Sequence, residues 1–185
     1  MQTPGVLTLE TAPEATKPLF QAITKMVGRL PNLYSVIGNS AIGLQANLDF
    51  GTALEKGNFD FKHGEVIKLA ASEANACHYC ISAHSAILQS LGFSKEATEQ
   101  VRFGGHPDAK IEAIARLTRE IVEKRGYPSE AAVQNFYAQG FGHDAVVELV
   151  GFIALNTMNN YLNHLSNTPI DWPAVAQLPT PLNER

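Results

Sequence analysis

Residues 65–92 read EVIKLAASEANACHYCISAHSAILQSLG and decide how the centre of the chain folds. Apolar residues recur in this stretch at helical spacing, and it contains no proline. Asn75 can cap the start of a helix, and Gly92 stands where a left-handed residue would end one. We therefore expect one helix up to about Ala76 and a second helix from Cys77 to Gly92.

Helices also fill the rest of the chain. Proline, the strongest helix breaker, is missing from residues 32–106 and from residues 129–168. Hydrophobic periodicity predicts further helices over residues 13–29, 33–56, 94–102, 108–126, 129–140 and 144–165. No alternating strand pattern occurs, so the sequence predicts an all-α fold of about seven to eight helices.

The chain is expected to form a single domain, residues 1–185. A domain of this length can bury roughly two thirds of its unfolded surface without metal or disulfide cross-links. Its predicted parts are a helical N-terminal region of about 13–60, a core with the C-x2-C pattern of about 64–103, and an extended C-terminal tail of about 167–185. Prolines keep the tail extended, and we expect Trp172 to pack it back onto the helices.

Composition excludes several classes of protein and partner. The 185 residues are 45% hydrophobic and 17% charged with a net charge of −4, which excludes an intrinsically disordered chain. No block of Lys and Arg occurs, so we expect neither nucleic acid nor a membrane as a partner. No apolar stretch reaches the roughly 20 residues that span a bilayer, and residues 1–10 lack the apolar region of a signal peptide. We expect a cytoplasmic protein.

The residue pattern that carries chemistry is C-x2-C-x3-H. Cys77 and Cys80 are the two cysteines of the chain, and His84 follows Cys80 by four residues, which places thiol and imidazole on one helix face. The residues of this face are Cys77, Cys80, Ile81, His84, Leu88 and Leu91. Because the face is apolar, we expect it to be buried and the site to be a pocket. The imidazole can accept the Cys80 proton, whereas the helix N-terminus favours a thiolate at Cys77.

A reactive thiolate beside a second thiol is typical of redox proteins, because the second thiol converts a sulfenic acid into a disulfide. Three other interpretations compete: a structural disulfide, a zinc site made by both cysteines with His84 and a carboxylate, and two inert core cysteines. A reducing cytoplasm opposes the first, the lack of a second C-x2-C pair opposes the second, and the joint spacing opposes the third. We expect redox chemistry without a metal or other cofactor.

The stretch from Glu65 to Ser94 resembles a known family. Glu65 followed by eleven residues, the C-x2-C-x3-H pattern and the sequence LGFS at residues 91–94 are similar to the alkylhydroperoxidase D (AhpD)-like branch of the carboxymuconolactone decarboxylase family. The similarity extends more loosely from Pro31-Asn32 through the second helix and to the Asn-rich last helix. Thioredoxin, which also carries C-x2-C, places it after a strand in a βαβ unit that this sequence lacks.

The resemblance implies a fold, an activity and residue roles. It implies an all-helical subunit that assembles into trimers or hexamers and reduces hydroperoxides with thiols, without haem or metal. Peroxide would oxidise Cys80 to the sulfenic acid, and Cys77 would resolve it to the disulfide. Glu65 and His84 would relay protons. The residues themselves leave the order of the thiols open, since the base favours Cys80 and the helix dipole favours Cys77; we follow the base.

Glu65 needs a helix of its own to reach the thiols. On one continuous helix, twelve residues would separate Glu65 from Cys77 by about 18 Å. A break at residues 74–76 lets the Glu65 helix fold across the cysteine helix, where a buried carboxyl group near His84 could hold or pass a proton. Without that break Glu65 is an exposed carboxylate at a helix start, and Glu73 is its substitute.

Other polar residues near the pattern are weaker candidates. The polar residues of the last predicted helix are Asn156, Asn159, Asn160, Asn163 and His164. A stripe of this kind more often makes hydrogen bonds between helices or subunits than it binds substrate, and we expect the former. His78 and Tyr79 lie between the cysteines and could tune the thiols, although such positions usually point sideways.

The sequence therefore predicts a thiol-dependent peroxidase, similar to alkyl hydroperoxide reductases. Its expected partners are a hydroperoxide substrate, a dithiol, thioredoxin-like or lipoyl reductant, and further copies of the same chain. One alternative is a dithiol–disulfide reductase or a redox-sensing protein of the same family; a sensor would oxidise once, while a peroxidase would cycle. Another is a decarboxylase of the carboxymuconolactone type, which the presence of both cysteines opposes.

Overall fold

The computed structural model describes residues 3–176, and every regular element in that range is helical. Its helices are α1 Lys17–Val27, α2 Asn32–Ile37, α3 Ala41–Leu54, α4 Phe61–Ala74, α5 His78–Ser90, α6 Lys95–Arg102, α7 Ala109–Glu123, α8 Glu130–Ala138 and α9 His143–Ser166. The all-α prediction is confirmed. The described residues form nine helices, one more than the upper predicted number, because one predicted helix is two.

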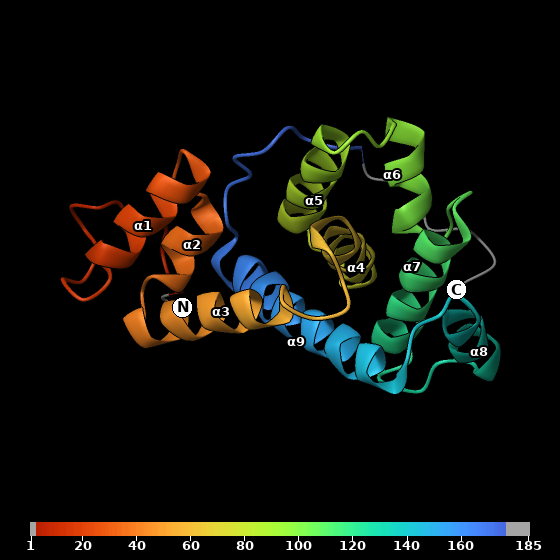
Figure 1. Ribbon diagram of the computed structural model, residues 1–185. Helices are drawn as coiled ribbons and strands as arrows, with labels where there is room; N and C mark the ends of the chain where they lie inside the picture. The colour runs from red at the N-terminus through yellow and green to blue at the C-terminus, as the bar shows by residue number, and fades with distance from the viewer. Residues whose placement is uncertain (1–2, 177–185) are drawn as a thin grey trace.

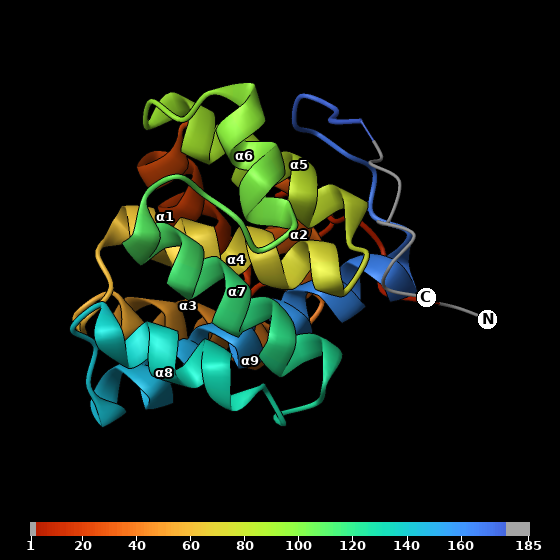
Figure 2. The ribbon, with the colours of Figure 1, turned by 90° about the vertical axis from the view of Figure 1, so that its right-hand side faces the viewer.

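Helix α4 is the centre of the fold, and α5, α6, α7 and α9 pack around it (Figure 1). Figure 2 shows α4 from the side, between α5 and α6 above it and α9 below it. The side chains of Val66, Ile67, Leu69 and Ala70 on α4 are completely buried. A helix that is apolar on most of its faces has to be enclosed by other elements, and this places the stretch that carries Glu65 in the core.

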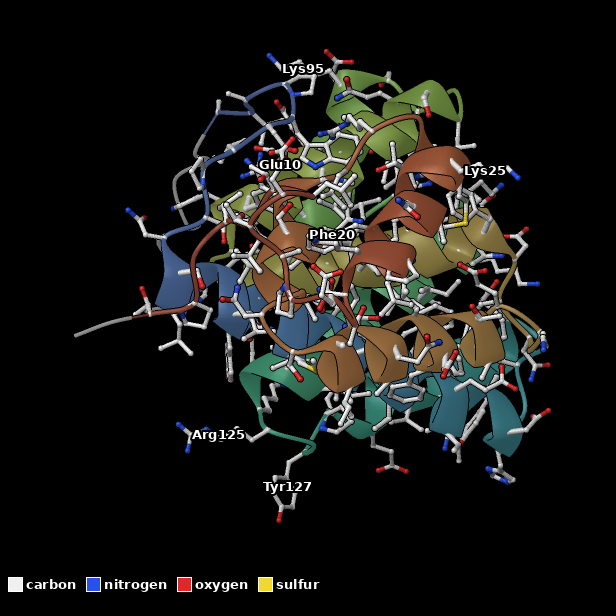
Figure 3. All side chains as sticks on the ribbon, turned by 90° about the vertical axis from the view of Figure 1, so that its left-hand side faces the viewer. Glu10, Phe20, Lys25, Lys95, Arg125 and Tyr127 are labelled. Carbon is white, nitrogen blue, oxygen red and sulfur yellow. The ribbon has the colours of Figure 1, made fainter. Side chains whose placement is uncertain are left out.

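Helices α1, α2 and α3 form the N-terminal part around a second apolar cluster that includes Phe20. In Figure 3, Phe20 lies in the middle of this part, whereas Tyr127 projects away from the body of the molecule. The prediction of one helix over residues 33–56 is wrong, because the helical conformation is interrupted between α2 and α3.

Two contacts explain the break between α2 and α3. Gly38 lies so close to the Phe20 ring that an added Cβ would stand 2.3 Å from its Cζ atom. The Gly38 carbonyl accepts a hydrogen bond of 2.9 Å from the Thr16 hydroxyl. The Ser40 side chain then caps α3 by accepting a bond of 3.0 Å from the Gly43 N–H. A helix therefore ends and another begins where the sequence shows only a glycine inside a periodic stretch.

The turn between α4 and α5 brings the cysteines back toward Glu65. Asn75 is the C-cap of α4, not the predicted N-cap of α5, and Ala76 adopts a left-handed conformation with φ of 56°. The Ala76 N–H donates to the Glu73 carbonyl and the Cys77 N–H to the Ser72 carbonyl, both at 2.9 Å. These two bonds form a Schellman motif, which satisfies the last carbonyls of α4 and leaves Cys77 as the N-cap of α5.

The segment after α9, residues 168–176, is a strap that crosses the helices. It runs up between α2 and α5 and across to α6 (Figure 1). The Arg29 guanidinium and Asp171 form an ion pair at 2.5 Å, and the Arg102 guanidinium donates to the Ala176 carbonyl at 3.0 Å. Trp172 packs against the cluster of Cys77 and its neighbours, as expected. The remainder of the predicted tail, residues 177–185, lies outside the described residues.

Helices α3 and α9 share an apolar outer face. Its exposed large side chains are Ile42, Phe50, Val147, Val150, Met158, Tyr161 and Leu165. The two helices cross closely, since an added Cβ at Gly51 would lie 3.6 Å from a methyl group of Leu155. Among residues 3–176, no helix is both long enough and apolar enough to cross a membrane.

Candidate functional site

The two thiols form a buried pair at the start of α5. Cys77 is completely buried and Cys80 is 2% exposed, and both are free cysteines. Their sulfur atoms lie 2.6 Å apart. The predicted burial of this face is correct up to Leu88, but Leu91 lies beyond the end of α5 and is 42% exposed. The pair can therefore close to a disulfide with little movement, while both sulfurs remain shielded from bulk water.

A cavity of about 570 Å³ opens in front of Cys80. Its polar wall contains Cys80, His84, Glu65 and Lys68, and its apolar walls include Met26, Leu33, Leu48, Ile87, Phe152 and Trp172. Cys77 does not line the cavity and lies behind Cys80. A small molecule that enters from this side meets the Cys80 sulfur first. The volume is in the usual range for a small-molecule site.

Glu65 lies at the centre of a buried polar group. Its carboxylate contacts the His84 Nδ1 atom at 2.7 Å and the Lys68 Nζ atom at 2.9 Å, and its side chain is 3% exposed. Burial raises the pKa of this carboxyl group, but His84 and Lys68 outweigh burial and lower the pKa of Glu65 to about 2. The structure thus brings Glu65 to His84 across the turn at residues 74–76. Glu73, the substitute, instead pairs with Arg102 at 2.6 Å.

The two thiols differ in acidity. The hydrogen bond between the thiols and the backbone N–H of Cys80 lower the pKa of Cys77. Burial and the adjacent Cys77 raise the pKa of Cys80 well above its usual value. The lowered pKa of Cys77 agrees with the expectation from the helix dipole, whereas access from the cavity favours Cys80. Cys77 is therefore the more acidic thiol, and Cys80 is the thiol that a substrate in the cavity can reach.

Asn163 is a site residue that sequence reasoning assigned only to hydrogen bonding between helices. Its Nδ2 atom lies 3.2 Å from the Cys80 sulfur and 4.0 Å from the Cys77 sulfur. Asn156 and Asn160 do bond between helices, both to the Ser72 hydroxyl of α4. The spacing of the three asparagines, one helical turn apart each time, is the signal that puts all of them on the face toward α4 and α5.

The two residues between the cysteines lie on different faces of α5, one exposed and one buried. His78 is exposed and does not line the cavity. Tyr79 is buried, and its hydroxyl accepts a hydrogen bond of 3.2 Å from the Leu33 N–H. Burial raises the pKa of Tyr79, and so does the carboxylate of Asp171 on the strap. Tyr79 therefore ties α5 to α2 and to the strap rather than to the thiols.

Two further observations limit what the site can hold. Within residues 3–176, no group of three or more His, Cys, Asp or Glu side chains is arranged to hold a metal ion. A larger cavity of about 700 Å³ lies between residues 6–9 and α1, but no thiol, imidazole or carboxylate lines it. The candidate chemistry therefore belongs to the cavity at Cys80. The absence of metal and cofactor from the purified protein stays a prediction.

The chain is an all-helical protein with a buried C-x2-C thiol pair beside a Glu–His pair, and comparison with known proteins finds similar folds. Residues 44–123 match the model of the carboxymuconolactone decarboxylase family. The matched range includes Glu65, both cysteines and His84. A comparison with curated protein sequences finds no significant match.

Solved structures extend the similarity to nearly the whole chain. A peroxidase-related protein from Ralstonia eutropha JMP134, described as an alkylhydroperoxidase AhpD core, has a TM-score of 0.78 and 19% identity over 90% of each chain. A peroxidase-related protein from Silicibacter sp. TM1040 has a TM-score of 0.75 and 19% identity, covering 91% of this chain and 92% of its own. A cysteine-to-alanine variant of the debrominase Bmp8, in complex with 2,3,4-tribromopyrrole, has a TM-score of 0.75 and 16% identity over 92% of each chain. At these identities the likeness shows the fold.

Proposed function

We propose that the protein is a thiol-dependent peroxidase that reduces organic hydroperoxides. The observation that carries the proposal is the order of groups along the cavity: substrate space, then Cys80 with the Glu65–His84 pair beside it, then Cys77 behind. The apolar walls suit the organic part of a hydroperoxide, and a small number of polar groups at one end suits its reacting oxygens. The family match and the peroxidase-related neighbours support the same chemistry.

The proposed cycle balances with one hydroperoxide and one dithiol. The Cys80 thiolate attacks the outer oxygen of the hydroperoxide, the O–O bond breaks, and the alkoxide leaves as an alcohol after it takes a proton. Cys77 then attacks the sulfur of the Cys80 sulfenic acid and releases water, which leaves the disulfide. A dithiol reductant, of the thioredoxin-like or lipoyl type, restores both thiols by exchange through a mixed disulfide. Neither haem nor metal takes part.

A steady-state assay tests this function. Purified protein is mixed with cumene hydroperoxide or hydrogen peroxide and, in parallel, with dithiothreitol, dihydrolipoamide or reduced thioredoxin. We expect repeated turnover, with equal amounts of hydroperoxide consumed and dithiol oxidised, and a preference for the organic hydroperoxide because the cavity walls are apolar. One oxidation per chain without turnover would contradict the proposal and favour a redox-sensing protein. Disulfide exchange without hydroperoxide loss would favour a dithiol–disulfide reductase.

Reductive debromination is a second candidate, and the similarity to the debrominase Bmp8 favours it. The same thiol pair could supply the electrons, because a C–Br bond and two thiols give a C–H bond, a disulfide and HBr. The apolar cavity in front of Cys80 would accept a flat halogenated ring. Adding a brominated pyrrole to the assay and measuring bromide separates the candidates: bromide release with dithiol oxidation, without hydroperoxide loss, would replace the peroxidase by a debrominase.

The proposed peroxidase assembles into a closed homo-oligomer, a trimer or hexamer. The outer face of α3 and α9 supports this, because large apolar side chains are exposed on two helices that cross closely. We expect Val150→Asp to lower the mass measured by light scattering to that of a monomer of 20.1 kDa, because a buried carboxylate opposes the interface.

A matched substitution tests whether the effect belongs to that face. Tyr127 is 83% exposed but lies between α7 and α8, away from the face, and Tyr127→Asp should keep the native mass. A monomeric native protein at micromolar concentration would contradict the proposed assembly. Location in the cytoplasm is a separate prediction that these variants do not address.

A further inference from the structure

The hydrogen bonds around Cys80 raise the question of which group takes its proton. His84 follows Cys80 by one helical turn, yet among the described residues its side-chain hydrogen bond goes to Glu65. Cys80 instead contacts the Cys77 sulfur at 2.6 Å and the Asn163 Nδ2 atom at 3.2 Å. His84 lines the cavity where the substrate would lie, whereas Cys77 and Asn163 do not.

Cys77 is suited to hold a negative charge. It is the N-cap of α5, so its side chain lies at the positive end of the helix dipole, which favours a thiolate. Its sulfur also interacts with the backbone N–H of Cys80. A proton that leaves Cys80 therefore has an acceptor in direct contact, and that acceptor needs no movement of α5.

Asn163 is fixed in the position where it can stabilise charge on Cys80. The residue is 4% exposed, and its backbone carbonyl accepts the N–H of Thr168 at 3.1 Å, which closes the end of α9. Its side-chain N–H groups donate, and the acceptor nearest to them is the Cys80 sulfur. A donor held at a buried sulfur stabilises the thiolate more than the thiol.

We propose that Cys77 and Asn163 activate Cys80: a Cys77 thiolate, which has lost its own proton to solvent, takes the Cys80 proton, Asn163 donates a hydrogen bond to the resulting Cys80 thiolate, and His84 protonates the leaving alkoxide. This inference rests on the proposed peroxidase function. The protons balance, because the one that passes to Cys77 later leaves with the sulfenic hydroxyl group as water when the disulfide forms. The alkoxide takes its proton from His84, which contacts Glu65 and regains a proton from solvent. Asn163 is then a catalytic residue, since it touches the reacting sulfur.

The pH dependence of Cys80 alkylation tests the proposal without hydroperoxide. The titratable side chains that line the cavity or contact Cys80 are Tyr34, Glu55, Glu65, Lys68, Cys77, Tyr79 and His84. Reaction with iodoacetamide, followed at Cys80 by mass spectrometry between pH 5 and 10, reports its thiolate. We expect Asn163→Ala to slow alkylation at pH 7 about tenfold and to move the profile up by about one pH unit. Asn163→Asp should move it further, because a carboxylate replaces the donor.

Variants of His84 and of Asn135, an asparagine far from the thiols, are the controls. His84→Gln should leave the Cys80 alkylation profile within about twofold of the native protein, yet reduce hydroperoxide turnover by about 10²–10⁴-fold. Asn135 bonds to Glu112 between α8 and α7, so Asn135→Ala removes an asparagine hydrogen bond without touching the thiols and should change neither measurement. Circular dichroism confirms the fold of each variant, and the use of both Asn163 variants keeps the test valid if one fails to fold.

Two outcomes would overturn the inference. One is an alkylation profile that shifts with His84→Gln as much as with Asn163→Ala, which would return the base to His84. The other is an unchanged profile in both folded Asn163 variants. Hydroperoxide consumption is measured on the same samples: its absence from the native protein would reject the proposed function alone, because the alkylation profiles report thiolate formation in any case.

Discussion

Cys80→Ser is expected to abolish hydroperoxide consumption, whereas the Cys77→Ser protein, which also lacks the proposed proton acceptor, should complete one turnover more slowly and stop with a sulfenic acid at Cys80. The reason is that a hydroperoxide in the cavity can reach the Cys80 sulfur but not the Cys77 sulfur. Cys80 lines the cavity, and Cys77 is completely buried behind it. Without Cys77 no resolving thiol is present, so dimedone should label Cys80 in the stalled protein. Mass spectrometry of the dimedone adduct, with stopped-flow measurement of peroxide loss, checks both expectations.

The two cysteine variants are each other's controls, because each keeps one thiol in the same pocket. The acidity of the thiols works against this assignment, since the pKa is lowered at Cys77 and raised at Cys80. A dimedone adduct on Cys77 in the Cys80→Ser protein, together with none on Cys80 in the Cys77→Ser protein, would reverse the roles. Acidity would then outweigh access in choosing the attacking sulfur.

Glu65→Leu is expected to reduce the free energy of unfolding by about 3–5 kcal/mol, because the change leaves Lys68 and His84 without the carboxylate that pairs with both of them in the core. The midpoint of urea unfolding at pH 7, with an unchanged slope, measures this loss. Glu99→Leu is the matched control. Glu99 is a partly exposed helix partner of Lys95 at 4.0 Å, and its loss should cost less than about 1 kcal/mol.

The Glu65 ion pairs also predict how stability depends on acid. The pKa of Glu65 is lowered from 4.5 to about 2, so the folded state prefers the ionised form more than the unfolded state does. The contribution is therefore complete above about pH 4.5 and is lost as the pH falls toward 2. Native protein should lose this part of its stability over that interval, and Glu65→Leu should not. Equal acid sensitivity of the two proteins would contradict the buried ion pair.

Most residues of the candidate site could be predicted from the sequence, because they lie close together along the chain. Residues 65–92 supply Glu65, both thiols and His84, and the need for a break between Glu65 and Cys77 followed from helix length alone. Hydrophobic periodicity and the absence of proline then predicted the helices around them. Hydrophobic periodicity describes one face of one helix. It therefore predicts best those parts of the candidate site that lie on a single helix.

The features that sequence reasoning missed depend on contacts between distant segments or on backbone conformation. The break at Gly38 depends on the ring of Phe20 in another helix, and a glycine within a periodic stretch does not reveal that partner. Asn163 reaches Cys80 from a helix 83 residues further along the chain. The turn after α4 depends on Ala76 in a left-handed conformation, which residues other than glycine rarely adopt, and the sequence pattern alone favours Asn75 as an N-cap of α5.

The strap gives the protein a built-in optical property. Trp172 is the single tryptophan of the chain, and it packs beside the two cysteines under the guanidinium of Arg29, which lies 4.2 Å from the indole ring centre. All tryptophan fluorescence of the chain therefore originates at the dithiol. Emission from this one ring follows the surroundings of the sulfurs directly, so the redox state of the site can be monitored in the unlabelled protein in real time.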